Sequence, residues 1–166
     1  LPKGVRNGLF RMLFIGVKTP LDFQLRFMKH VVRYVLKKYA RGYTFNHDTI
    51  SNRGNQLFIS NHRDIVLDSA ILDLMLHEAG FPTTCEIAIG DNLLIYPWIK
   101  TLVRMNKAFT VRRSLKAKEM MESSILMSRY MHYAITEKKE NIWIAQREGR
   151  AKDSSDHTQD SVLKML

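Results

Sequence analysis

The chain has 166 residues, of which 45% are hydrophobic and 25% charged, and its 26 Lys and Arg outnumber its 16 Asp and Glu. This length and apolar content predict one folded domain with a sizeable core and exclude a disordered chain. The single cysteine, Cys85, excludes an intrachain disulfide and any multi-cysteine metal site, and the longest apolar run, residues 12–17, is too short to cross a bilayer. The net charge of +10 indicates an anionic partner, which can be nucleic acid, anionic lipid or a phosphorylated small molecule.

Two helices are predicted at the N-terminal end. Residues 9–17 are largely apolar with basic flanks, which indicates a short basic amphipathic helix. A second helix is predicted to begin at Pro20 with Thr19 as its N-cap, because apolar side chains recur at helical spacing from there until Gly42. Residues 1–42 are therefore expected to form an N-terminal helical pair.

Beyond residue 42, short buried strands alternate with helices. Strands are predicted at residues 57–60, 86–89, 108–112 and 141–145. Helices are predicted at residues 64–79, 92–105 with an interruption at Pro97, 117–138 and 157–166. This alternation predicts an α/β fold with a mostly parallel sheet flanked by helices. We expect a single domain over residues 1–166, whose α/β core, residues 43–166, is truncated at its C-terminal end.

The turn after the first predicted strand holds the clearest candidates for catalysis. His62 lies where a buried strand ends and a helix begins, which is where open α/β sheets place their sites. Asp68 shares its helix face with Ile65 and Leu72, so its carboxylate lies on an apolar face and needs a partner. Asp64, at the predicted helix start, is interpreted as an ordinary N-cap.

A carboxylate beside a histidine can make that histidine a general base. Asp68 would accept a hydrogen bond from one ring nitrogen of His62 and leave the other free to take a proton. No serine lies on a nucleophile elbow and Cys85 lies in a predicted strand, so direct base catalysis is favoured over a covalent intermediate. From spacing alone, a structural ion pair is an equally good interpretation of the two residues.

Arginines follow two further predicted strands. Arg113 comes after the strand at 108–112, and the run Arg147, Glu148, Gly149 and Arg150 comes after the strand at 141–145. The planar guanidinium binds phosphate with two parallel hydrogen bonds, and glycine lets the backbone approach a ligand closely. Ordinary surface arginines, or an ion pair between Glu148 and Arg150, are the alternative interpretation.

These segments together resemble the glycerolipid acyltransferases, which include glycerol-3-phosphate and lysophosphatidate acyltransferases. The resemblance extends from Leu57 to about Leu166. Residues 61–68 resemble the first motif of the family. Residues 90–94, followed by Pro97, resemble the donor-side segment of its bacterial glycerol-3-phosphate branch. Residues 107–113 resemble its second motif, and residues 148–150 resemble its third. The resemblance implies that His62 and Asp68 form the catalytic pair. It also implies that the phosphorylated acceptor is bound by Arg113, Glu148, Gly149 and Arg150.

The chain departs from the family pattern at three places. Five residues separate His62 from Asp68 where the family has four, which keeps Asp64 as an alternative partner. Lys107 stands where the family usually has glycine. Arg150 follows its glycine directly, without the intervening threonine of many members, which leaves Arg147 as an alternative phosphate contact. The family's fourth, proline-containing motif is absent from the chain.

The resemblance implies transfer of a fatty acyl group, in phospholipid biosynthesis, to a hydroxyl of a glycerol phosphate or lysophospholipid. The donor would be an acyl-CoA or acyl carrier protein thioester, and neither a metal nor a further cofactor is expected. The expected location is the cytoplasm, with peripheral attachment to the inner face of the cell membrane. Two alternatives explain the positive charge without catalysis: a nucleic-acid-binding module, and a lipid-surface protein that uses the basic helices within residues 6–17 and 20–39.

Overall fold

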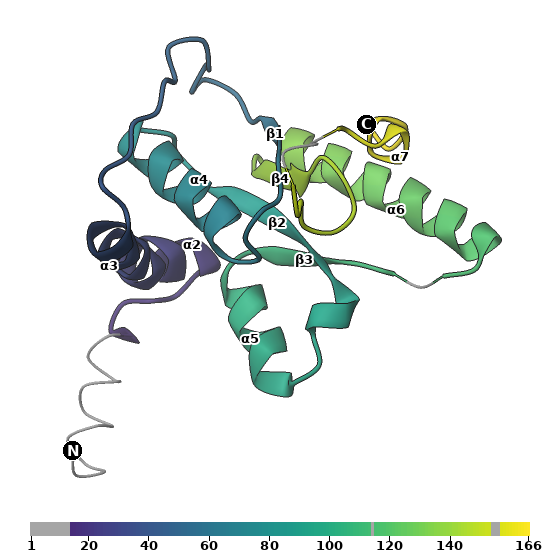
Figure 1. The fold of residues 1–166 in the computed structure, drawn as a ribbon, viewed down its shortest axis with the longest axis horizontal. Coiled ribbons are helices and arrows are strands. Elements are labelled where there is room, and N and C mark those ends of the chain that lie inside the picture. The colour runs from purple at the N-terminus through teal and green to yellow at the C-terminus, as the bar shows by residue number, and fades with distance from the viewer. Residues whose placement is uncertain (1–13, 114, 154–156) are drawn as a thin grey trace.

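The computed structural model describes residues 14–113, 115–153 and 157–166. At its centre is a four-stranded sheet with the order β1-β4-β2-β3, in which each neighbouring pair is parallel (Figure 1). The strands are β1 (Leu57–Ser60), β2 (Cys85–Gly90), β3 (Ala108–Val111) and β4 (Asn141–Ala145). The predicted α/β fold with a parallel sheet flanked by helices is confirmed.

Helices pack on both faces of this sheet. In chain order they are α2 (Pro20–Phe23), the π-helical turn η1 (Gln24–Met28), α3 (Lys29–Tyr39), α4 (Leu67–Glu78), the 3-10 turn η2 (Asp91–Leu93), α5 (Pro97–Met105), α6 (Ala117–Thr136) and α7 (Asp160–Leu163). The N-terminal helices, α4 and α5 lie on one side, and α6 and α7 lie on the other (Figure 1). Across the described residues, no helix is long and apolar enough to cross a membrane.

The N-terminal helix begins where the sequence predicts. The Thr19 hydroxyl accepts from the backbone N–H of Asp22 at 3.1 Å, and the Asp22 carboxylate accepts from the N–H of Thr19 at 2.9 Å. This reciprocal capping box satisfies N–H groups that the first turn cannot. Helical structure then continues, through the π-helical turn, to Tyr39. The other member of the predicted pair, residues 9–17, lies mostly outside the described residues.

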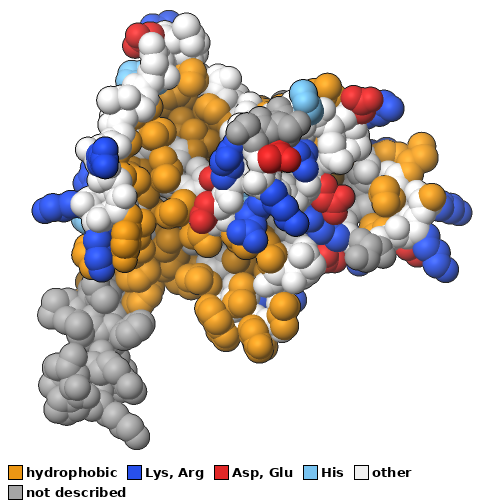
Figure 2. Space-filling view, in the orientation of Figure 1, with side chains coloured by type: hydrophobic (Ala, Val, Ile, Leu, Met, Phe, Trp, Pro, Cys, Tyr) orange, Lys and Arg blue, Asp and Glu red, His pale blue; other side chains and the backbone are white. Residues whose placement is uncertain are grey.

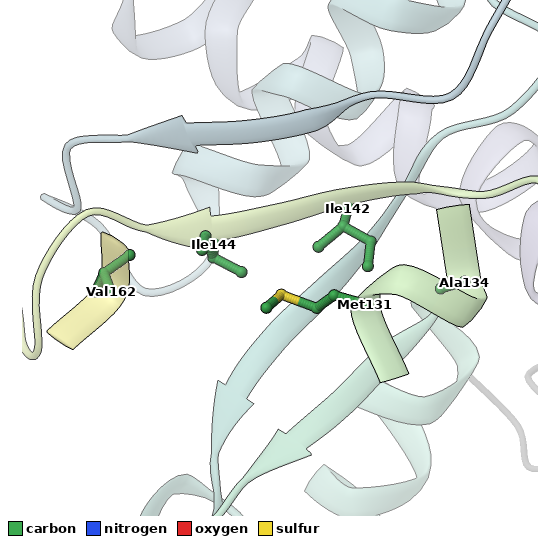
Figure 3. Packing of buried hydrophobic residues seen from close by; sticks show 5 residues of the cluster. All are labelled: Met131, Ala134, Ile142, Ile144 and Val162. Carbon is green, nitrogen blue, oxygen red and sulfur yellow. The ribbon is translucent and has the colours of Figure 1, made fainter. Parts of the chain in front are cut away.

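The core on the α6 side is built by alternate residues of β4. Ile142 and Ile144 are buried against Met131 and Ala134 of α6 and Val162 of α7 (Figure 3). Successive side chains of a strand point to opposite faces, so a central strand needs apolar residues at every position. This explains the apolar run from Ile142 to Ala145 that follows the buried Asn141 at the start of β4.

A second core cluster lies on the α4 side. Trp143, the β4 residue between the two isoleucines, packs there with Leu76 of α4, Phe81 and Cys85. The burial of Cys85 raises the pKa of its thiol well above the usual value. The residue is therefore a packed core group, which agrees with its predicted place in a strand.

Several helix bounds differ from the prediction. The helix expected at 92–105 begins only at Pro97, and the helix expected at 117–138 ends at Thr136. Two further differences have specific hydrogen bonds as their cause. The helix expected at 64–79 begins at Leu67, because the Asp64 carboxylate accepts from the N–H groups of Val66 and Leu67 and holds a turn. The helix expected at 157–166 forms only over Asp160–Leu163. Gln159, in the expected first part of this helix, has an extended backbone instead, and its N–H donates to the Gln146 carbonyl at 2.9 Å.

Lys107, at a position where the resemblance implies glycine, adopts a left-handed backbone conformation with φ 59°. Glycine adopts this conformation without strain, whereas a lysine there needs support from elsewhere. Its buried ammonium donates to the Glu140 carboxylate at 2.5 Å, the Thr83 hydroxyl at 2.9 Å and the Thr84 carbonyl at 3.2 Å. These bonds stabilise the turn that joins α5 to β3.

Candidate active site

The parallel sheet brings the predicted site segments to one edge. His62 follows β1, residues 147–150 follow β4, and Arg113 follows β3, so all three leave the carboxyl ends of their strands. The loops after β1 and β4 are also bonded to each other, because the N–H of Ala151 donates to the His62 carbonyl at 2.7 Å. The positioning of His62 therefore depends on two segments nearly ninety residues apart in the chain.

His62 is held by Asp68. Asp68 Oδ2 lies 3.0 Å from His62 Nδ1 and also accepts from the backbone N–H groups of Arg63 at 2.7 Å and Asp64 at 3.0 Å. An ionised carboxylate can only accept, so Nδ1 carries the hydrogen and Nε2 presents its lone pair. Among the described residues, Nε2 has no hydrogen-bond partner. The ring is therefore oriented as a base with one nitrogen available.

Trp143 completes the support of His62. The two rings meet edge to face, with centroids 5.8 Å apart, and the indole N–H donates to the Ser60 hydroxyl at 2.9 Å. The sequence alone does not place this residue in the site, because a tryptophan in a buried strand is an ordinary core residue. Only the pairing of β1 with β4 reveals its contact with His62.

Asp64, the alternative partner in the sequence, has another role in the structure. Its carboxylate accepts from Leu67 at 2.8 Å and Val66 at 2.9 Å. These backbone hydrogen bonds hold the pKa of Asp64 below its usual value, and the nearby charge of Arg150 lowers it further. Asp64 is thus an ionised group at the start of α4, and Asp68 is the carboxylate bonded to the imidazole.

Arg113 is positioned by contacts from two other loops. Its backbone N–H donates to Asp91 at 3.1 Å, and its guanidinium donates to Glu148 at 3.2 Å. A Cβ added to Gly90 would lie 2.4 Å from Asn92 Oδ1 and 2.6 Å from Arg113 Nε, so these two side chains would have to shift. The alternative ion pair of Glu148 with Arg150 is wrong. Glu148, in the loop after β4, is paired with Arg113, in the loop after β3.

The third motif segment lies beside the His62 turn. Arg150 is exposed, and the next residue, Ala151, donates its backbone N–H to the His62 carbonyl at 2.7 Å. Gly149 has φ +72°, a conformation that residues with a Cβ rarely adopt, so it allows the tight turn that precedes Arg150. Arg147 is half-buried in the same loop. Cationic groups are therefore gathered around one edge of the sheet, and Figure 2 shows such a cluster.

An apolar cavity of about 350 Å³ begins next to this edge. It lies between the N-terminal helix, α4, α5 and the sheet, and Ile65 and Val66, from the turn after His62, form part of its wall. Deeper wall residues include Leu74, Ile87, Ile99 and Val103. An apolar hydrocarbon group can therefore be held in this cavity, whose wall begins at the turn that follows His62.

Buried polar groups form another part of the cavity wall. Asp73 accepts from the Cys85 N–H at 2.8 Å and from the Gln24 amide at 3.0 Å, and Gln24 also bonds Thr84 and the Asn106 carbonyl at 3.1 Å. Burial raises the pKa of Asp73 to about 7. The network satisfies each of these buried groups and ties the π-helical turn to α4 and the sheet.

The raised pKa of Asp73 predicts a pH-dependent stability. The protonated form is favoured in the folded state up to about pH 7, whereas an unfolded aspartic acid titrates near 3.8. The free energy of unfolding is therefore expected to fall as pH rises from about 4 to 7. Urea unfolding across this range measures the slope, and Asp73→Asn should flatten it. An equal slope in the variant would assign the dependence to other groups.

Within the described residues, no three His, Cys, Asp or Glu side chains are grouped to hold a metal ion.

Residues 43–161 match the acyltransferase family model. The chain has no match among curated proteins or solved structures. The matched segment contains the whole sheet, the His62–Asp68 pair and the arginine loops. The chain belongs to the acyltransferase family.

Proposed function

We propose that the protein transfers a fatty acyl group from a thioester, on coenzyme A or acyl carrier protein, to a hydroxyl of a glycerol phosphate or lysophospholipid. The reaction would belong to phospholipid biosynthesis. The observation that carries the proposal is the 3.0 Å contact of His62 Nδ1 with Asp68, beside an apolar cavity and between arginine-bearing loops. Family membership favours catalysis over the two binding-only alternatives, nucleic-acid binding and a passive lipid-surface role.

The proposed mechanism uses His62 as base and then as acid. Nε2 takes the proton of the acceptor hydroxyl while its oxygen bonds to the thioester carbonyl carbon. The tetrahedral intermediate collapses, the carbon–sulfur bond breaks, and the imidazolium returns the proton to the thiolate. Asp68 stabilises the imidazolium formed between these steps. The chain supplies both groups, and the products are an ester and a free thiol.

The donor's hydrocarbon chain would occupy the apolar cavity. Ile65 and Val66 lead from the turn after His62 into the cavity wall, so an acyl chain inside would leave its carbonyl carbon near Nε2. Burial of the chain stabilises the complex by about 0.8 kcal/mol for each methylene. Binding energy far from the carbonyl would then hold the reacting carbon in place.

The acceptor's phosphate would bind the arginines at the same edge. Arg113 is one-third exposed and paired with Glu148, whose side chain is largely exposed, so this ion pair is weak enough for a phosphate to compete with it. Arg150 makes no ion pair within the described part of the chain. Both guanidinium groups can donate two parallel hydrogen bonds to a phosphate. The hydroxyl to be acylated would then be held at attack distance from His62.

The reaction is tested by incubating the protein with radiolabelled palmitoyl-CoA or palmitoyl-acyl carrier protein and a panel of acceptors. The panel contains glycerol 3-phosphate, lysophosphatidate and their dephosphorylated counterparts, glycerol and monoacylglycerol. We expect labelled ester with a phosphorylated acceptor and much less with its counterpart. Equal transfer to both would overturn the phosphate requirement, and absence of ester with every pair would overturn the proposed substrate class.

Arg113→Lys is expected to raise KM for the phosphorylated acceptor about tenfold with little change in kcat or melting temperature. Lysine keeps the charge but loses the second parallel hydrogen bond. Arg112→Lys is the matched control, because this neighbouring arginine is exposed and has no ion pair among the described residues. An unchanged acceptor KM in Arg113→Lys, or an equal rise in the control, would contradict the role of Arg113.

A further inference from the structure

The loop before α5 and the first turn of this helix expose large apolar side chains at the carboxyl edge of the sheet. Ile95 is 74% exposed, Tyr96 57% and Trp98 64%, and we call these three residues the α5 tip. The tip follows β2 by way of η2, so it leaves the same carboxyl edge as His62. Scattered single apolar residues are common on protein surfaces, whereas a group of this size marks an interaction site.

The α5 tip is continuous with the cavity. Trp98 and Leu102 line the cavity and are also exposed, as are Ile65 and Val66 across its mouth. Figure 2 shows apolar surface running over this part of the molecule to the protruding end of α5, next to the basic cluster. Exposed apolar side chains therefore continue from the α5 tip into the wall of the cavity, where a hydrocarbon chain can contact them.

Helix α5 is amphipathic. Ile99 and Val103 line the cavity, and Trp98 and Leu102 line it at its exposed side, where they form an apolar stripe. Lys100 and Arg104 form a second exposed stripe, without an acidic partner within the described residues. An apolar, aromatic face opposite a basic polar face is typical of helices that lie in the interface of an anionic membrane.

We propose that the α5 tip inserts into the interfacial layer of an anionic lipid bilayer and turns the His62 edge toward it. A bilayer fits better than an acidic protein, because the tip is mainly apolar, the basic cluster at the same edge lies next to it (Figure 2), and Lys100 and Arg104 lie on the polar face of the same helix. Insertion would hold the cavity mouth against the lipid. The proposal deepens the proposed function, since lipid acceptors and products reside in a bilayer, but the binding it predicts is measurable without any acyl transfer.

The test measures binding of the intact chain to phosphatidylcholine vesicles with and without phosphatidylglycerol. The chain has two tryptophans, and Trp143 is buried, so Trp98 reports insertion as a blue shift of its fluorescence. Flotation of vesicles with bound protein measures affinity. The wild type should bind the vesicles that contain phosphatidylglycerol, with a blue shift, and bind phosphatidylcholine alone more weakly.

Two matched variants locate the binding surface. Ile95→Ser with Tyr96→Ser removes two side chains of the tip and leaves Trp98 in place, and serine suits position 96 because Tyr96 is the N-cap of α5. This variant should bind about tenfold more weakly. Met121→Ser with Leu126→Ser removes side chains that are 68% and 69% exposed on α6, and it should bind like the wild type.

Several results would overturn the proposal: no vesicle binding by the wild type, equal binding by the tip variant, or an equal loss in the α6 variant. A tip variant that keeps vesicle binding but loses binding to acyl carrier protein would make the tip a protein-docking surface instead. Failure of the proposed function is separate, because it would appear as absent ester formation by a wild type that still binds vesicles.

Discussion

Replacing His62 with alanine is expected to lower the rate of acyl transfer about 10²–10⁴-fold while the fold remains intact. The substitution removes the nitrogen that would take the proton, and among the described residues no second histidine is bonded to Asp68. The lost contacts are one hydrogen bond to Asp68 and a ring contact with Trp143, so the change in stability should be near 1 kcal/mol.

Steady-state kinetics and thermal unfolding measure the two effects of His62→Ala separately. His132→Ala is the control, because His132 is exposed on α6 and its replacement should change neither quantity. A folded His62→Ala protein with wild-type turnover would exclude His62 as the base, whatever the acceptor.

Asp68→Asn is expected to lower kcat about 10²-fold or more, with a small change in KM. The amide keeps an oxygen that can accept from the backbone, but it loses the negative charge that stabilises the imidazolium. The three donors that converge on Oδ2 in the wild type would also compete for a neutral oxygen. The loss should therefore appear in catalysis more than in acceptor binding.

Asp64→Ala tests whether the assignment of the two carboxylates is correct. Asp64 bonds the N–H groups of Val66 and Leu67, so its removal should cost about 0.5–2 kcal/mol of stability and leave kcat nearly unchanged. If Asp64→Ala lost turnover while Asp68→Asn kept it, the pair at the active site would be His62 with Asp64.

Several features of this protein follow from local sequence alone. The bounds of β1 and β4 are predicted to the residue, because each is an apolar run between polar segments. Thr19 and Pro20 mark the start of the N-terminal helix by chemistry within one turn. The contact of His62 with Asp68 is also local, since six positions separate them and the helix face of Asp68 is set by its neighbours.

Other features depend on segments that are far apart in the chain. The Arg113–Glu148 contact joins the β3 and β4 loops, and the placement of Trp143 beside His62 requires β1 to pair with β4. The left-handed Lys107 is supported by side chains before β2 and β4. Sequence patterns report the preferences of neighbouring residues, so they carry no signal for such contacts.

The sequence by itself determined the fold class, the order of strands and helices along the chain, and the residues that would meet at the carboxyl edge of a parallel sheet. The tertiary structure alone decided the strand order, the partner of Glu148, the cavity beside His62 and the exposed apolar tip of α5. The physical reason is that helix and strand formation depend mainly on neighbouring residues. Burial and pairing depend on which distant segments the folded chain brings together.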